Sequence, residues 1–118
     1  MLADDDELIR RSIELTLSQK GINVLLAEDG VAALRTYLDN RDHIDLAILD
    51  VVMPKKNGWQ VYEIIKKDQP DFKVIFISGF TDNIITPKVI TKENQEFLDK
   101  PLDIELLMAK VWHILRKQ

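Results

Sequence analysis

The sequence contains no cysteine, no long apolar run and no excess of positive charge. Without cysteine the chain forms neither disulfides nor thiolate metal sites, as is typical of proteins in a reducing cytoplasm. No apolar stretch approaches the roughly 20 residues of a membrane-spanning helix, and the first residues lack the pattern of a signal peptide. The formal net charge of −4 offers no basic surface for nucleic acid. We therefore expect a cytoplasmic domain that contacts neither a membrane nor nucleic acid.

The remaining composition is that of an ordinary globular protein, with 46% hydrophobic and 31% charged residues. A chain of 118 residues is long enough for one hydrophobic core and too short for two ordinary domains, so we expect a single domain over residues 1–118. Only three residues precede the first acidic cluster. We expect an unusually short first strand, with the chain beginning inside the domain or with native residues missing before Met1.

Short apolar runs alternate with longer segments of helical period, a pattern that predicts an α/β domain with a parallel sheet. We expect five helices, of which the fourth, within residues 81–95, is short or irregular because it contains β-branched residues and Pro87. Asn40 and Pro70 mark the expected ends of the second and third helices, and Asp103 is the expected N-cap of the last. The five expected strands span residues 1–3, 22–27, 44–50, 73–78 and 96–99.

Polar side chains stand at the ends of four of these strands. In an open parallel sheet, ligands bind beyond the carboxyl ends of the strands, so these side chains should share one crevice. The second strand also ends in acids, at residues 28–29, but it should lie at the edge of the sheet. The residues expected in the crevice are Asp4, Asp5 and Asp6 after the first strand, Asp50 in the third, Ser78 in the fourth and Lys100 after the fifth.

The carboxylates of this crevice predict a metal site. Three carboxylates at one point repel one another, and Mg²⁺, which prefers oxygen ligands, is the natural counter-charge. Asp5 and Asp50 are suited to direct ligation. The backbone carbonyl of Val52 is a candidate third ligand, and Asp4 would act through a water molecule. Asp6 is more simply read as the N-cap of the first helix.

The other two side chains suit phosphoryl transfer. The Ser78 hydroxyl and the Lys100 ammonium would give a phosphoryl group a hydrogen bond and a counter-charge. A carboxylate can itself act as the nucleophile and become an aspartyl phosphate. Asp50, at the end of the central strand, is the candidate for that role.

These motifs together resemble the receiver domains of two-component response regulators, over essentially the whole chain. The resemblance rests on the pair Asp4-Asp5, on Asp50 in "LDVVMPKKNG", on Ser78 in "FISGF" and on Lys100 in "FLDKP". It implies a flavodoxin-like, doubly wound sheet with strand order 2-1-3-4-5. The longer stretches "FISGFTDN" and "FLDKPLDIELLMAKV" look most like receivers attached to hybrid sensor histidine kinases.

The resemblance also implies roles for individual residues. Asp50 would accept a phosphoryl group from the phosphohistidine of a sensor histidine kinase or a histidine phosphotransfer domain, with Mg²⁺ required. Ser78 and Lys100 would contact that group, and Ser78 and Phe97 would act as switch residues. The final helix and Phe97 would form a signalling face through which the domain could dimerise. The Lys100–Pro101 peptide bond should be cis.

Two alternatives remain beside this interpretation. A pseudo-receiver would keep the fold as an interaction module and never accept phosphate. A metal-dependent phosphatase would use an aspartate nucleophile, but it usually needs a second acid nearby and a substrate cap. Here Val52 stands two residues beyond Asp50, and the chain has no room for a cap. The two histidines, His43 and His113, are predicted to be structural or surface residues. The aromatic residues Trp59, Tyr62 and Trp112 are predicted to be packing or interface residues.

Overall fold

The structure, a computed structural model, describes residues 1–79 and 95–116. Most of the predicted fourth helix lies outside these ranges, so the helix labelled α4 corresponds to the fifth helix predicted from the sequence. The strands are β1 (Leu2–Ala3), β2 (Leu26–Ala27), β3 (Ala47–Asp50), β4 (Val74–Ser78) and β5 (Gln95–Asp99). The helices are α1 (Glu7–Gln19), α2 (Gly30–Asn40), a short 3₁₀ helix (Arg41–His43), α3 (Gly58–Asp68) and α4 (Ile104–Arg116).

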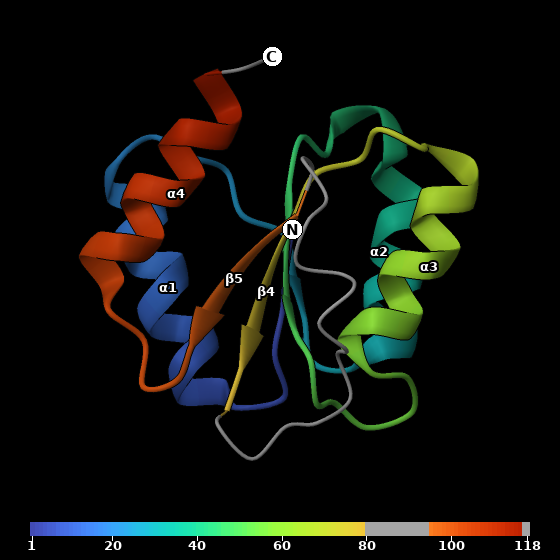
Figure 1. Cartoon of the computed structure of the whole chain (residues 1–118), viewed down its shortest axis with the longest axis horizontal. Helices are drawn as coiled ribbons and strands as arrows, with labels where there is room; N and C mark the ends of the chain where they lie inside the picture. The colour runs from blue at the N-terminus through green and yellow to red at the C-terminus, as the bar shows by residue number, and fades with distance from the viewer. Residues whose placement is uncertain (80–94, 117–118) are drawn as a thin grey trace.

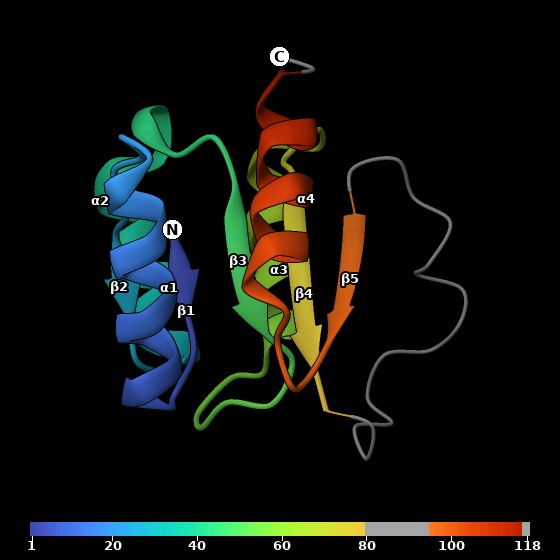
Figure 2. The same ribbon diagram turned by 90° about the vertical axis from the view of Figure 1, so that its left-hand side faces the viewer.

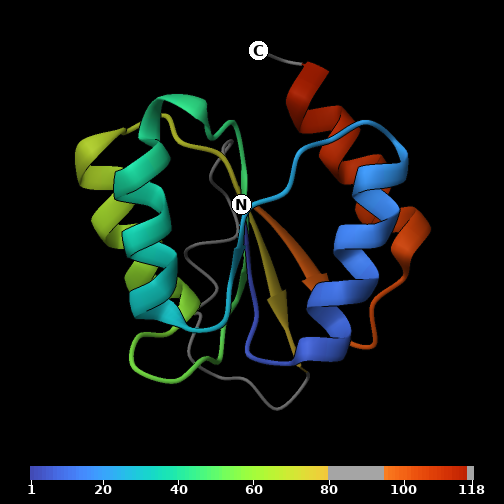
Figure 3. The same ribbon diagram turned by 180° about the vertical axis from the view of Figure 1, so that it is seen from behind.

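The five strands form one parallel sheet in the order β2-β1-β3-β4-β5, which confirms the predicted topology. Helices α1 and α4 cover one face of the sheet, and α2 and α3 cover the other (Figures 1 and 3). The strand arrows point to the same edge, the lower one in Figure 2, so the residues that follow the strands meet there. This edge is where the sequence places the polar side chains.

The core consists of two apolar layers, one on each face of the sheet. Alternate residues of β3 and β4 belong to different layers: Ile48 and Ile75 pack with α1 and α4, whereas Leu49 and Phe76 pack with α2 and α3. Because both faces are covered, the central strands β1, β3 and β4 are apolar at nearly every position instead of at every second one. The first polar residue in β3 is Asp50, its last residue.

Helix starts follow the capping signals of the sequence. Asp6 accepts hydrogen bonds from the backbone N–H groups of Leu8 (2.9 Å) and Ile9 (3.3 Å), and Asp103 accepts one from Leu106 (3.2 Å). Both predicted N-caps are thus confirmed. None of the helices in residues 1–79 and 95–116 combines the length and hydrophobicity of a membrane span.

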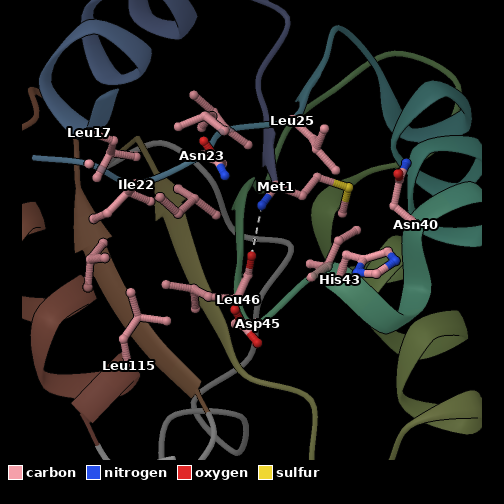
Figure 4. Close-up of a pocket in the computed structure, with 16 residues that line it drawn as sticks. Met1, Leu17, Ile22, Asn23, Leu25, Asn40, His43, Asp45, Leu46 and Leu115 are labelled. Carbon is pink, nitrogen blue, oxygen red and sulfur yellow. Dashed lines mark hydrogen bonds between the residues drawn. The ribbon is translucent and has the colours of Figure 1, made fainter. Parts of the chain in front are cut away.

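Two strands are shorter than predicted. The strand expected over residues 22–27 is reduced to Leu26–Ala27, and the one expected over 44–50 is reduced to Ala47–Asp50. Both flank β1, which pairs with its neighbours through Leu2 and Ala3. A parallel ladder extends only as far as the strand that its neighbours share, so residues 22–25 and 44–46 lie outside it. These residues line a groove (Figure 4).

Candidate functional site

Strand register brings the acids together. Leu2 and Ala3 of β1 pair with Ile48 and Leu49 of β3, so Asp4 comes beside Asp50. One carboxylate oxygen each from Asp4, Asp5 and Asp50 lies within 4.8 Å of the others. Asp4 and Asp50 are buried, at 0% and 1% exposure, whereas Asp5 is exposed and forms the rim of the cluster.

Lys100 lies across the two buried carboxylates. Its Nζ is 3.1 Å from Asp50 Oδ2, as a hydrogen bond, and 3.8 Å from Asp4 Oδ2. The backbone N–H of Lys100 donates to the carbonyl of Ser78 (2.8 Å), which continues the pairing of β4 with β5 past Asp99. The Lys100–Pro101 peptide bond is cis, as predicted. The side chains of four predicted site residues therefore lie close together: Asp4, Asp5, Asp50 and Lys100.

Burial and nearby charges shift the pKa values of Asp50 and Lys100. Burial, and next the charge of Asp4, raise the pKa of Asp50 to about 7, although Lys100 and the N–H of Val52 oppose the shift. Burial by itself would lower the pKa of Lys100, but its contacts with Asp50 and the charges of Asp4 and Asp5 raise it. The lysine thus stays charged while the carboxylates lack sufficient counter-charge.

The cluster fits a hard divalent cation. Asp4 Oδ1 accepts a hydrogen bond from the Asp6 N–H (2.8 Å), but the buried Oδ2 atom has no hydrogen-bond partner. A buried carboxylate oxygen without a hydrogen bond is costly unless a cation compensates it. Oxygen atoms from two or three carboxylates, open to solvent at Asp5, are the kind of ligand set that Mg²⁺ takes.

Close backbone contacts fix the path of residues 51–57, the loop that follows Asp50. The N–H of Val52 donates to Asp50 Oδ1 (3.2 Å), and the N–H of Gly58 donates to the carbonyl of Val51 (2.9 Å). A Cβ atom on Gly58 would collide with the carbonyl group of Asp50. Only glycine lets α3 begin this close to the end of β3.

The same loop is held from the other side by the start of α2. The N–H of Gly30 donates to the carbonyl of Pro54 (3.3 Å), and a Cβ atom on Gly30 would meet Lys56 Cβ at 2.5 Å. Asp29, which caps α2, also pairs with Lys55 Nζ (3.5 Å). The acids at the end of β2 therefore lie outside the metal-compatible cluster, as predicted for an edge strand, and Asp29 anchors the loop that follows Asp50.

We expect Gly30→Ala to raise the dissociation constant for Mg²⁺ by about tenfold, at the low end of what supporting residues contribute to a metal site. The added methyl group must push away Lys56, and with it the loop that carries Val52. Isothermal titration calorimetry measures the affinity. Arg35→Ala, at an exposed position of the same helix, is the control. An unchanged affinity in a folded Gly30→Ala protein would show that the position of the loop does not matter to the metal.

We also expect Mg²⁺ to raise the melting temperature, because the ion binds the assembled carboxylates of the folded state. At ten times the dissociation constant the gain is about 1.4 kcal/mol, or several degrees for a domain of this size. Differential scanning calorimetry in chelator and in millimolar Mg²⁺ measures it, with K⁺ at equal ionic strength as the control. Equal melting temperatures in both solutions would mean that the cluster does not bind the ion.

The two predicted switch residues lie on neighbouring strands. Ser78 is half-buried at the end of β4, where it pairs with Asp99. Phe97 is half-buried in β5, and its ring stacks on that of Phe76 with the centroids 5.3 Å apart. Phe76 in turn contacts the rings of Trp59 (5.8 Å) and Tyr62 (5.6 Å). The prediction that these two aromatic residues of α3 serve packing is confirmed.

Some contacts of the site had no clear sequence signal. Arg10 donates to the backbone carbonyl of Asp4 (2.6 Å) and so ties α1 to the end of β1. Asp29 and Gly30 carried the ordinary signal of a helix start, and only the tertiary contact shows that they hold the loop. Within the described ranges, the metal-compatible group includes neither histidine; both are exposed, as expected for surface residues.

A flavodoxin-like sheet with buried acids and a lysine at its carboxyl edge defines an α/β signalling domain of the receiver type. Comparison with known proteins agrees, because the sequence model of the response regulator receiver domain matches residues 1–112. The chain belongs to this family, whose members function in two-component signalling.

The relatives include a response regulator and a sensor kinase, and the chain covers different shares of them. The chain is 31% identical over 117 residues to response regulator RR06 of Streptococcus pneumoniae, covering 99% of this chain and 52% of that protein. It is 30% identical over 118 residues to sensor kinase CckA of Brucella abortus, covering 100% of this chain and 12% of the kinase. A response regulator receiver domain protein from Clostridium thermocellum has a similar structure, with a TM-score of 0.88 and 30% identity, over 98% of this chain and 92% of that one. The chain thus spans about half of one relative and a small part of the other.

Proposed function

We propose that the chain is a phosphoacceptor domain that takes a phosphoryl group onto Asp50 in a histidine-to-aspartate relay. The observation that carries the proposal is a buried carboxylate at the end of the central strand, in contact with Lys100 and within 4.8 Å of two further acids. Such a constellation is costly to a protein that does not use it. It supports a functional receiver more than a pseudo-receiver.

Asp5 and Asp50 hold Mg²⁺ directly in this proposal, with the carbonyl of Val52 as third ligand and Asp4 acting through water. When bound there, the ion would supply positive charge beside the phosphoryl oxygens. The chain's own contribution is to hold the three carboxylates at one point and to fix the Val52 segment. Gly58 and Gly30 make the second of these possible through their close backbone contacts.

Transfer replaces one bond to phosphorus by another. A carboxylate oxygen of Asp50 attacks the phosphorus of a phosphohistidine, the new O–P bond forms as the N–P bond breaks, and the imidazole nitrogen keeps the electron pair of the broken bond. Lys100 Nζ, which already lies 3.1 Å from Asp50 Oδ2, pairs with a phosphoryl oxygen. Ser78 donates a hydrogen bond to another. Apart from its own phosphorylation and dephosphorylation, the domain catalyses nothing in this proposal.

In this proposal, phosphorylation changes the surface that the domain presents to a partner. Ser78 moves toward the phosphoryl group, and Phe97, stacked on Phe76, changes its packing in response. The face of α4 exposes Leu106 (47%) and Trp112 (39%), which suits contact with a partner or a second copy. The partner that supplies the phosphoryl group is a cytoplasmic sensor histidine kinase or histidine phosphotransfer domain. Residues 1–118 act as one domain, and the similarity to CckA favours a place in a hybrid kinase.

Transfer from a phosphohistidine tests the proposal. A kinase core labelled on histidine with radioactive phosphate is mixed with the chain in Mg²⁺, and label should move to the chain within minutes. Asp50→Asn should accept none, whereas Asp71→Asn, an exposed acid near the opposite edge of the sheet, should accept label like the parent. Failure of several kinase cores and of a small-molecule phosphodonor to label the parent would favour the pseudo-receiver.

A further inference from the structure

The turn between β1 and α1 carries two acids of the metal-compatible cluster and lies at the carboxyl edge of the sheet (Figure 2). Hydrogen bonds hold Asp4 in this turn from several sides. Its N–H donates to the carbonyl of Ala27 (3.2 Å), its Oδ1 atom accepts from the N–H of Asp6 (2.8 Å), and its carbonyl accepts from Arg10 (2.6 Å). Its Oδ2 atom, which faces Lys100 at 3.8 Å, has no hydrogen-bond partner among the described residues. The polar atoms of Asp4 are thus engaged, except the one turned toward the cluster.

The Asp5 carboxylate depends on this backbone for its direction. Asp5 is exposed, and it lies between Asp4 at the end of β1 and Asp6, the N-cap of α1. The carbonyl of Asp4 belongs to the planar peptide unit that joins Asp4 to Asp5, so a contact that fixes this carbonyl also fixes the plane from which Asp5 starts. The Arg10 guanidinium supplies that contact through a short hydrogen bond from a charged donor.

The place of Arg10 in its helix makes this contact notable. Arg10 lies in the first turns of α1, where its own N–H donates to the carbonyl of the N-cap Asp6 (3.0 Å). A cation near the positive end of the helix dipole is unfavourable, and helical side chains lean toward that end. None of the ion pairs within residues 1–79 and 95–116 includes Arg10. The guanidinium therefore holds the backbone of the turn and leaves its carboxylates to a metal ion.

The next residue, Arg11, shows what an ordinary surface arginine of this helix does. It pairs with Glu7, one turn earlier, at 3.1 Å, and both side chains are largely exposed. Such a pair contributes little to stability. Arg10 is half-buried instead. Two neighbouring arginines thus differ in whether they contact the backbone that carries the acids.

We propose that Arg10 is a positioning residue of the metal site, whose guanidinium holds the Asp4–Asp5 peptide unit so that the Asp5 carboxylate lies beside Asp50. It touches neither the ion nor the carboxylates. This role rests on the proposed ligation of Mg²⁺ by Asp5 and Asp50. Charge alone would have the opposite effect: losing a nearby cation strengthens the binding of Mg²⁺, whereas losing a positioning contact weakens it.

The test is Arg10→Met, which keeps a long side chain and removes its donors. Its dissociation constant for Mg²⁺, measured on the folded protein by isothermal titration calorimetry, should rise by about tenfold, at the low end of what supporting residues contribute to a metal site. Electron paramagnetic resonance of Mn²⁺, which takes similar oxygen ligands, should show the same ratio by spectroscopy.

Two control variants in the same helix separate positioning from charge and from stability. Arg11→Met loses the same charge one residue away, and its dissociation constant should stay within about twofold of the parent's because exposed charges are screened. Ile13→Val shortens a buried side chain of α1. It should lower the free energy of unfolding and leave the affinity of the folded protein for Mg²⁺ unchanged.

An Arg10→Met protein that binds Mg²⁺ as tightly as the parent would overturn this role, because the turn would then need no help from the guanidinium. Tighter binding would mean that Arg10 acts only through its charge. An equal loss of affinity in Ile13→Val would mean that affinity merely follows stability. In these cases the parent still binds Mg²⁺, so the proposed function stands. A parent that binds no Mg²⁺ would overturn the metal site and the role of Arg10 together.

Discussion

Replacing Asp50 by asparagine is expected to stabilise the metal-free protein at about pH 8 by up to about 4 kcal/mol. The cause is the cost of holding a second buried carboxylate beside Asp4 with only Lys100 to compensate both. Asparagine keeps the shape and the capacity to hydrogen-bond but carries no charge. Urea unfolding in chelator measures the difference.

The effect of Asp50→Asn should depend on pH in a defined sense. Folding raises the pKa of Asp50 from 3.8 to about 7, so the folded state holds the proton more tightly. This contribution to stability is complete below pH 3.8 and is lost as the pH rises through about 7. The advantage of the variant should therefore be greatest above about pH 7 and shrink toward about pH 4. Titration of the Met1 amino group cancels, because both proteins carry it.

Mg²⁺ should make the parent more stable than Asp50→Asn, because the ion compensates the charge of the carboxylate that the variant lacks. Asp71→Asn, at an exposed acid, should show neither the pH dependence nor the reversal. A metal-free Asp50→Asn protein that is less stable than the parent at about pH 8 would contradict the electrostatic account.

Lys100→Ala is expected to destabilise the metal-free protein by about 2 kcal/mol at about pH 8, because it leaves two buried carboxylates without a cation. The loss stays below that of a fully buried pair, since Lys100 is partly exposed, at 29%, and Asp50 can take up a proton. Mg²⁺ should restore most of the stability by supplying the missing charge. Chemical unfolding with and without Mg²⁺ separates the two contributions.

Lys110→Ala is the matched control for Lys100→Ala. Lys110 is similarly exposed, at 26%, and pairs with Glu96 at 3.8 Å, away from the acidic cluster. Its loss should cost well under about 1 kcal/mol and should not change the response to Mg²⁺. Equal losses in the two variants would mean that Lys100 contributes no more than an ordinary surface ion pair.

The position of the site was predictable because the alternation of strands and helices fixes which residues follow the strands. That pattern alone places Asp50 and Lys100 in one crevice, and in the structure Lys100 Nζ lies 3.1 Å from Asp50 Oδ2. The burial of each acid could be learned only from the structure. The sequence does not show that Asp4 is buried while Asp5 is exposed. That difference arises from the register of β1 against β3.

Contacts between segments far apart in the chain could not be predicted from the sequence. Gly30 has the local signal of a helix start, yet its close contact with Lys56 depends on how α2 sits against the loop after β3. The length of β2 was likewise misjudged, since residues 22–25 have strand composition but their pairing depends on how far β1 extends. Local pattern predicts the type of an element, whereas its partners decide its length.

Intact-mass measurement after incubation with a small phosphodonor and Mg²⁺ tests the central claim most directly. The account predicts one phosphoryl group on the parent protein, carried by the peptide that contains Asp50, and none on Asp50→Asn. Chelation of the metal should prevent the addition in the parent. Phosphorylation of Asp50→Asn at the level of the parent would contradict the assignment of Asp50 as the phosphoacceptor.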